Sequence, residues 1–241
     1  IQSALRSGKI IIAGGITNAY VAEELLGVSI EEKHRYTAGI ITQGAYQCVT
    51  AEEERIAPYV MINGRAADRP WVEVLDEFTA GDVFIKGASA LDYTGMAGVL
   101  VSDPKGGTIG RALGTVGARG AHLVVPVGLE KMVPSVTQAA KAAGIGRMDF
   151  ALGKAVGLIP MVSAEVVTEI SALQMLFGVE ATLIGSGGVG GSEGAVTLVI
   201  EGDRALEAFS LVKQIKGEPR VEARKRNCQC QAPCGRFNPN I

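Results

Sequence analysis

The 241-residue chain has few aromatic side chains, little net charge and no long apolar run, and each absence excludes a class of protein. Phe, Trp and Tyr make up 5% of the residues, which leaves little for stacking on nucleic-acid bases. The 23 basic and 25 acidic side chains give a net charge of −2, so no overall field attracts DNA or RNA. No apolar stretch approaches the ~18 residues of a membrane span. We expect neither nucleic acid nor a membrane as a partner.

Cysteine is also scarce, with 4 residues in the chain. Cys48 stands alone, whereas Cys228, Cys230 and Cys234 form a C-x-C-x3-C string near the C-terminus. We therefore expect no disulfide framework, no secretory leader and a cytoplasmic location. The string could hold a soft metal such as zinc with a fourth ligand from elsewhere, or it could pack against a neighbouring subunit.

Glycine is in excess, with 32 residues, or about 13% against roughly 7% in average proteins. Many glycines follow short apolar runs, which predict strands over residues 9–13, 82–86, 98–102 and 122–127. After the first and third of these runs we expect helices that end near residues 26 and 119. This alternation of strand, glycine turn and helix predicts an α/β fold with a parallel sheet covered on both faces.

The pattern changes after about residue 155. The elements predicted there are a strand (156–162), a helix (164–177), two strands (179–184 and 195–200), a helix (203–217) and a strand (218–223). That βαββαβ order is the ferredoxin-like plan. The chain thus divides into a parallel-sheet domain (1–155), a smaller ferredoxin-like domain (156–223) and a basic tail (224–241). Abundant glycine and weakly amphipathic surface helices favour packing between subunits, so we expect a homo-oligomer.

The first glycine turn, Gly14-Gly15-Ile16-Thr17-Asn18, lies between a predicted strand and a predicted helix. Backbone N–H groups at a helix N-terminus favour a phosphate or carboxylate, glycine lets the anion approach, and the Thr17 hydroxyl adds a donor. Alternatively, the glycines only satisfy the dihedral angles of a tight turn. The segment matches neither the G-x-G-x-x-G nor the P-loop motif, and we expect no bound cofactor.

Two Lys-Gly turns repeat this arrangement at the ends of later strands. Lys86-Gly87-Ala88-Ser89 follows one strand, and Lys105-Gly106-Gly107-Thr108 follows the next. Open α/β sheets place their ligands at the carboxyl ends of the strands, where a lysine can pair with an anion and a hydroxyl can donate to it. We expect these turns to converge with the first glycine turn in one anion pocket, although each lysine could equally be a solvated strand-end residue.

Two carboxylates near the same edge could move protons. Glu130 follows the strand over 122–127 and could be a general base if partial burial raised its pKa, or it could be an exposed loop acid. Asp92 is the second candidate. The candidate anion-binding residues are Gly14, Gly15, Thr17, Asn18, Lys86, Gly87, Ser89, Lys105, Gly106, Gly107, Thr108 and Lys131.

The segments Gly14-Gly15-x-Thr17, 82–92 and 105–108 resemble those of one superfamily. It groups ribose-5-phosphate isomerases, glucosamine-6-phosphate deaminases, CoA transferases and initiation-factor-2B-like proteins. The resemblance covers about residues 8–220 and is strongest for a bacterial branch. It implies a Rossmann-like parallel sheet, with the ferredoxin-like domain that the isomerases carry. It also implies that the turn from Gly14 to Asn18 cradles a substrate phosphate.

The chain departs from this superfamily at the reacting groups. The segment 86–89 aligns with the isomerases' Asp-Gly-Ala-Asp motif, so both acids are replaced. The segment 105–109 matches their Lys-Gly-Gly-Gly-Gly run in part, without the general-base Glu that follows it. The nucleophilic Glu of the CoA transferases also has no clear equivalent.

These observations lead to several hypotheses. The first is an oligomeric sugar-phosphate isomerase-like enzyme, in which Lys86 and Lys105 neutralise a small anionic metabolite and Glu130 or Asp92 moves a proton. The replaced acids favour a second hypothesis, a non-catalytic ligand sensor or interaction module of the same fold. CoA transferase-like activity is a third and would need a glutamate that forms a thioester. A metal or redox role of the cysteine tail is a fourth.

Overall fold

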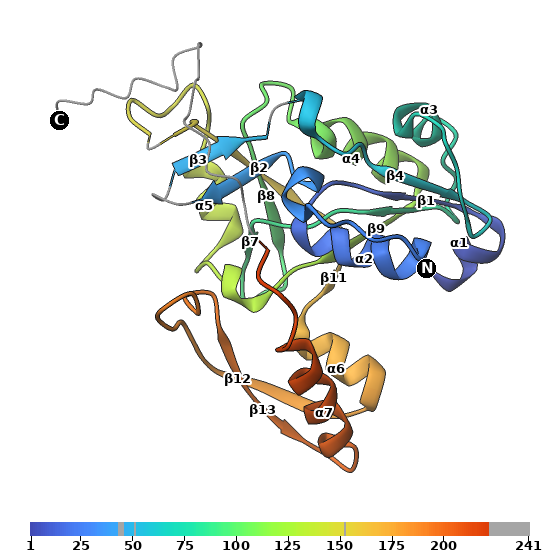
Figure 1. Ribbon diagram of the computed structural model, residues 1–241. Helices are drawn as coiled ribbons and strands as arrows, with labels where there is room; N and C mark the ends of the chain where they lie inside the picture. The colour runs from blue at the N-terminus through green and yellow to red at the C-terminus, as the bar shows by residue number, and fades with distance from the viewer. Residues whose placement is uncertain (43–45, 51, 152, 222–241) are drawn as a thin grey trace.

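The computed structural model describes residues 1–42, 46–50, 52–151 and 153–221, and it shows a mixed α/β protein. Figure 1 shows a larger layered part and a smaller part made of a hairpin and two helices. In the described ranges the helices are α1 (Gln2–Ser7), α2 (Ile16–Leu26), α3 (Trp71–Leu75), α4 (Gly107–Arg119), α5 (Val136–Ala142), α6 (Glu169–Phe177) and α7 (Ala205–Ile215). The 3-10 turns are η1 (Lys33–Tyr36), η2 (Glu52–Glu54) and η3 (Leu129–Lys131).

The central element is a six-stranded mixed sheet in the order β11-β9-β6-β1-β4-β5. Its members are β1 (Lys9–Ile12), β4 (Tyr59–Ile62), β5 (Arg65–Ala66), β6 (Val83–Ile85), β9 (His122–Pro126) and β11 (Glu165–Val167). Neighbours from β11 to β1 are parallel, whereas β4 and β5 are added antiparallel. The strands predicted over 9–13, 82–86 and 122–127 are therefore confirmed, as is their parallel pairing.

Helices cover both faces of this sheet (Figure 1). Side chains alternate between the faces of a strand, so neighbouring isoleucines of β1 enter different cores. Ile11 packs in one core with α3 and α4, whereas Ile10 and Ile12 pack in the other with α1 and α2. All three isoleucines are fully buried, which explains why β1 is a continuous apolar run.

A second, three-stranded sheet corrects part of the sequence prediction. It has the order β10-β8-β7, made of β7 (Ala90–Leu91), β8 (Ala97–Val101) and β10 (Gly157–Met161), and both pairings are antiparallel. The predicted strand over 98–102 is thus β8, but it does not join the parallel sheet. A short buried apolar run does not specify its partner strand, because periodicity carries no pairing information. A separate hairpin pairs β2 (Gly39–Thr42) with β3 (Tyr46–Val49).

The smaller part begins later than predicted. β10 pairs with β8 and β11 pairs with β9, so both strands complete sheets of the larger part, and the division falls after Val167 rather than at residue 155. The smaller part then contains α6, β12 (Glu180–Ser186), β13 (Val196–Glu201) and α7. Residues 218–221 form no strand, and 222–223 lie outside the described residues. The ferredoxin-like βαββαβ arrangement is therefore not formed in the described ranges.

The two helices of the smaller part pack on one face of the β12–β13 hairpin. Their core contains Leu173 from α6, Ala181 from β12 and Ala208 from α7. The tail over 224–241, with Cys228, Cys230 and Cys234, lies outside the described residues. Within the ranges that the structure describes, no cluster of three potential metal ligands is found, and no helix has the length and apolarity to cross a membrane.

Candidate functional site

The carboxyl ends of the four parallel strands lie side by side along one edge of the central sheet. The segments that follow these ends are Gly14-Gly15 after β1, Lys86-Gly87 after β6, residues 128–131 after β9 and Thr168-Glu169 after β11. This is the edge at which open α/β sheets place their ligands. We call these segments, together with the first turn of α2, the sheet-edge site.

Lys86 is the charged residue at the centre of the sheet-edge site. Its Nζ donates hydrogen bonds to the carbonyl oxygens of Gly14 and Gly87, at 3.3 Å each. Lys86 as a residue is half-buried. Burial, reinforced by the positive charge of Lys131, lowers the pKa of Lys86 from 10.5 to about 8.

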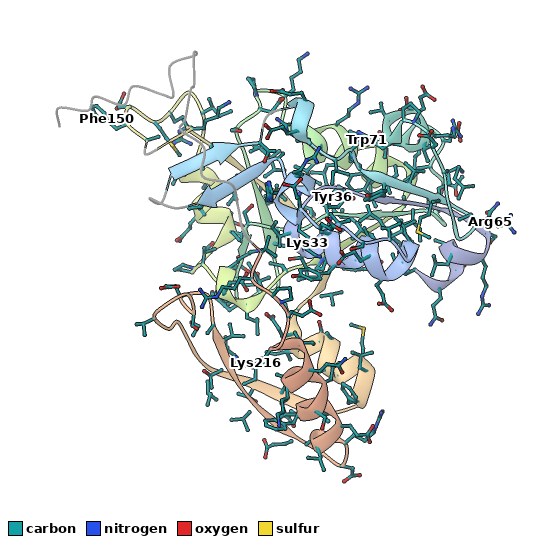
Figure 2. All side chains as sticks on the ribbon, viewed as in Figure 1. Lys33, Tyr36, Arg65, Trp71, Phe150 and Lys216 are labelled. Atoms are coloured by element: carbon teal, nitrogen blue, oxygen red, sulfur yellow. The ribbon has the colours of Figure 1, made fainter. Side chains whose placement is uncertain are left out.

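The glycine turn after β1 is closed by a residue that the sequence analysis did not identify. The backbone N–H of Gly15 donates to the carbonyl oxygen of Tyr36 at 2.6 Å. Tyr36 comes from η1, is fully buried inside the larger part (Figure 2), and its hydroxyl donates to the carbonyl oxygen of Ile12. A β-carbon on Gly14 would lie 2.7 Å from the Tyr36 carbonyl oxygen, so this close approach requires glycine. The Gly15 N–H is therefore not free for an anion.

The N-terminus of helix α2 nevertheless offers hydrogen-bond donors at the sheet-edge site. It begins after Gly15 with no side-chain cap, so the N–H groups of its first turn keep hydrogen-bonding capacity for a ligand. Thr17 lies in this first turn and is partly exposed. The positive end of the helix dipole favours an anion at the same place.

Asn18 joins two strand ends and leaves one polar atom without a partner. Its side chain is fully buried, and Nδ2 donates to the carbonyl oxygens of Ala13, at 2.6 Å, and Ile85, at 3.3 Å. Its Oδ1 is buried and accepts no hydrogen bond from any residue that the structure describes. This atom lies 3.6 Å from the place that a β-carbon on Gly87 would take. Buried polar atoms are rarely left unpaired, so this Oδ1 is an exception among the described residues.

The turn after β9 adds an acid and a second lysine. Nζ of Lys131 lies 3.7 Å from Oε1 of Glu130, and the two side chains are 31% and 33% exposed. The Glu130 carboxylate folds over Gly128, where a β-carbon would lie only 1.9 Å from Oε2. Glu169, at the start of α6, accepts a hydrogen bond from the Leu129 N–H at 3.0 Å and fixes the turn.

The β12–β13 loop also reaches Glu130. A β-carbon on Gly194 would lie 3.6 Å from the Glu130 Cγ atom. The smaller part of the molecule is therefore in contact with the sheet-edge site.

Two predicted site residues have structural contacts instead. The Ser89 hydroxyl accepts a hydrogen bond from the Leu100 N–H at 3.2 Å, within the β7–β8 hairpin. The buried Asp92 carboxylate accepts from Thr94, Met96 and Val136. Burial raises the pKa of Asp92, but these hydrogen bonds outweigh it and hold the pKa below its usual value. Asp92 therefore holds a turn and the start of α5, which corrects its assignment as a proton shuttle.

The second Lys-Gly turn follows β8, a strand of the three-stranded sheet, so the predicted convergence of all three turns on one edge is wrong. Lys105 and Gly106 lie instead beside an open depression of 560 Å³, lined also by Val101, Asp103, Pro104, Ile145, Gly146, Gly157 and Ile159. Gly106 and Gly107 adopt positive φ angles of 82° and 57°. A β-carbon on Gly110 would lie 2.5 Å from the Lys105 carbonyl oxygen. Backbone geometry thus explains these glycines, and Thr108 lies in the first turn of α4.

Two residues were not predicted from the sequence: Glu169 in the sheet-edge site, and Tyr36, which closes the first turn of that site. Glu169 follows β11, so applying the strand-end rule to that strand would have found it. Tyr36 comes from a short turn with no sequence signal for its position. Searches with family models, against curated proteins and against solved structures give no match for this chain.

Proposed function

We propose that the protein binds a small phosphorylated or carboxylated metabolite at the sheet-edge site. The observation that carries the proposal is Lys86, whose amine lies at the end of β6 with carbonyl oxygens as its hydrogen-bond partners. Among the described residues, no carboxylate lies within ion-pair distance of this amine. An anionic ligand would supply the missing countercharge.

Two further features support an anionic ligand. The uncapped N-terminus of α2 offers N–H donors, and Lys131 adds positive charge that Glu130 neutralises only in part at 3.7 Å. A phosphate suits this set of donors and charges, which agrees with the sugar phosphate that the superfamily resemblance implies.

For catalysis, we propose Glu130 as the group that moves a proton in an isomerase-like reaction. Its carboxylate is partly exposed beside Lys131, whereas Asp92 is occupied by structural hydrogen bonds. The loss of Asp92 as a second acid favours the alternative function, a sensor that binds the ligand without turnover. Turnover assays separate the two, because both should bind.

For the fold, we propose a variant of the Rossmann-like arrangement over residues 1–167. Its support is the set of four parallel strands between α2 on one face and α3 and α4 on the other. The antiparallel strands β4 and β5 and the three-stranded sheet are additions to that arrangement.

Thermal unfolding against a ligand panel tests the binding proposal. The panel contains sugar phosphates, nucleotides, CoA esters and inorganic phosphate. A ligand at 100 times its Kd adds about 2.7 kcal/mol, which raises the midpoint of a chain of this size by roughly 5–10 °C. We expect a shift with sugar phosphates and its loss in Lys86→Ala. A shift with CoA esters alone would favour the CoA transferase-like alternative, and no shift with any member would contradict the proposal.

A further inference from the structure

The hydrogen bonds of Lys86 fit a neutral amine as well as a charged one. A protonated lysine has three N–H donors, whereas a neutral amine has two donors and one lone pair. The structure provides two acceptors, the carbonyl oxygens of Gly14 and Gly87. With both donors occupied, the lone pair of the neutral amine is the group left for a ligand.

The surroundings also favour the neutral amine. The charged residue that acts on Lys86 is Lys131, whose own counterion is Glu130 at 3.7 Å, and the nearby N-terminus of α2 adds a positive dipole end. With a pKa of about 8, roughly a tenth of the Lys86 side chains are neutral at pH 7. An ordinary lysine would be neutral in only about 0.03% of molecules at that pH.

Gly87, which follows Lys86 and accepts a hydrogen bond from its amine, is not required by packing. A β-carbon there would make ordinary contacts, 3.6 Å from the Asn18 Oδ1 and 3.9 Å from the Pro126 carbonyl oxygen, whereas one on Gly14 would lie 2.7 Å from the Tyr36 carbonyl oxygen. Packing thus explains glycine at position 14 and does not explain it at position 87.

We propose that Lys86 is a nucleophile that forms an imine with a small aldehyde or ketone carrying a phosphate or carboxylate. This inference rests on the proposed function: Lys131 and the N-terminus of α2 would hold the anion, and the bound anion would place the carbonyl carbon against the neutral Lys86 amine. Lysines in desolvated surroundings or next to a second cation are known to act in this way.

The step balances without an oxidant or reductant. The neutral Nζ attacks the carbonyl carbon, a carbon–nitrogen bond forms, and the carbonyl electron pair moves to oxygen, which takes a proton. The nitrogen of the resulting carbinolamine loses a proton. The carbinolamine hydroxyl is then protonated and leaves as water, and the nitrogen lone pair forms the double bond of a protonated imine. Glu130, the carboxylate that pairs with Lys131 at 3.7 Å, is the group that we assign to these proton transfers.

Reductive trapping tests the proposal. The full chain is incubated with glyceraldehyde 3-phosphate and cyanoborohydride, and the modified lysine is identified by peptide mass spectrometry. We expect one adduct, on Lys86, forming at least about tenfold faster than with unphosphorylated glyceraldehyde because the phosphate positions the carbonyl. The adduct should disappear in Lys86→Arg and persist in the matched variant Lys105→Arg. Inorganic phosphate should compete with its formation.

The outcomes separate this inference from the binding proposal. Labelling that is spread over several lysines, or that is unchanged in Lys86→Arg, would overturn the proposal that Lys86 forms an imine. If phosphate still raised the thermal midpoint in that case, anion binding would stand and only the nucleophile would fail. If phosphate neither raised the midpoint nor slowed labelling, both would fail. Lys86→Met serves as a second variant if Lys86→Arg does not fold.

Discussion

The turns Lys86-Gly87 and Lys105-Gly106 look alike in sequence, since each follows a short apolar strand. The first lies at the end of a parallel strand, with its lysine among backbone carbonyl groups. The second follows an antiparallel strand, its lysine is exposed, and its glycines are explained by the close packing of α4 on its own loop. The surroundings of a shared motif are therefore set by the sheet that its strand joins, not by the residues of the motif.

The largest expected effect concerns the part of the molecule that contains the three-stranded sheet. Asp92→Ala should destabilise the protein by about 3 kcal/mol, because it leaves the buried Val136 N–H and the partly buried N–H groups of Thr94 and Met96 without their acceptor. Thermal unfolding should show a fall of roughly 6–12 °C. At temperatures where the variant is folded, its affinity for the panel ligand should equal that of the parent. A stable variant that had lost binding would instead return Asp92 to the site.

A pair of glycine substitutions sharpens the comparison further. Gly110→Ala places a β-carbon 2.5 Å from the Lys105 carbonyl oxygen, so it should cost about 2 kcal/mol of stability and leave ligand binding unchanged. In Gly87→Ala the new β-carbon makes ordinary contacts, so the stability should stay within about 0.5 kcal/mol of the parent protein's. The affinity for the ligand should nevertheless fall. Denaturant unfolding and ligand titration on both variants check this. The reverse pattern would place the site at the Lys105 turn.

A smaller effect on stability distinguishes the two lysines, and for Lys86 this effect depends on pH. Because the pKa of Lys86 is about 8 in the folded protein and 10.5 ordinarily, the unfolded chain binds more protons between these pH values. Stability should therefore rise with pH across that window. Lys86→Met removes the half-buried charge but also removes the hydrogen bonds to the carbonyl oxygens of Gly14 and Gly87. The net effect should be a rise in stability at pH 7 of about 1–2 kcal/mol.

The matched variant for this measurement is Lys105→Met. Its lysine is exposed, so we expect the stability at pH 7 to change by no more than about 0.5 kcal/mol. Denaturant unfolding at pH 7 and above pH 10 gives the free energy of unfolding of each variant at both pH values. A Lys86→Met protein that is less stable than its parent at pH 7 would show that the ammonium is well accommodated.

Much of the larger part could be predicted from the sequence. The apolar run of β1 and the glycine at position 27 gave a strand and a helix end close to those observed, because burial on both faces and a left-handed C-cap leave clear signals. The strand-end rule then located Lys86, Gly87 and Lys131. These features depend on local chemistry, which a sequence records directly.

Other features depend on long-range pairing, which the sequence records poorly. β8 and β10 have the apolar pattern of buried strands, but their pairing with each other is set by the whole fold. Asp92 resembles a candidate acid in sequence, and only its hydrogen bonds to Thr94, Met96 and Val136 identify its structural role. Tyr36 closes the first glycine turn from a segment more than 20 residues away along the chain.

The central claim is that the sheet-edge site, and not the Lys105 turn, binds the anion. Isothermal titration of ribose 5-phosphate into the parent protein, Lys86→Ala and Lys105→Ala tests it most directly. We expect Lys86→Ala to lose about 30-fold or more in affinity, in line with about 2 kcal/mol for a charge-assisted contact, and Lys105→Ala to stay within about twofold. Equal affinity of Lys86→Ala and the parent, or a loss confined to Lys105→Ala, would contradict the account.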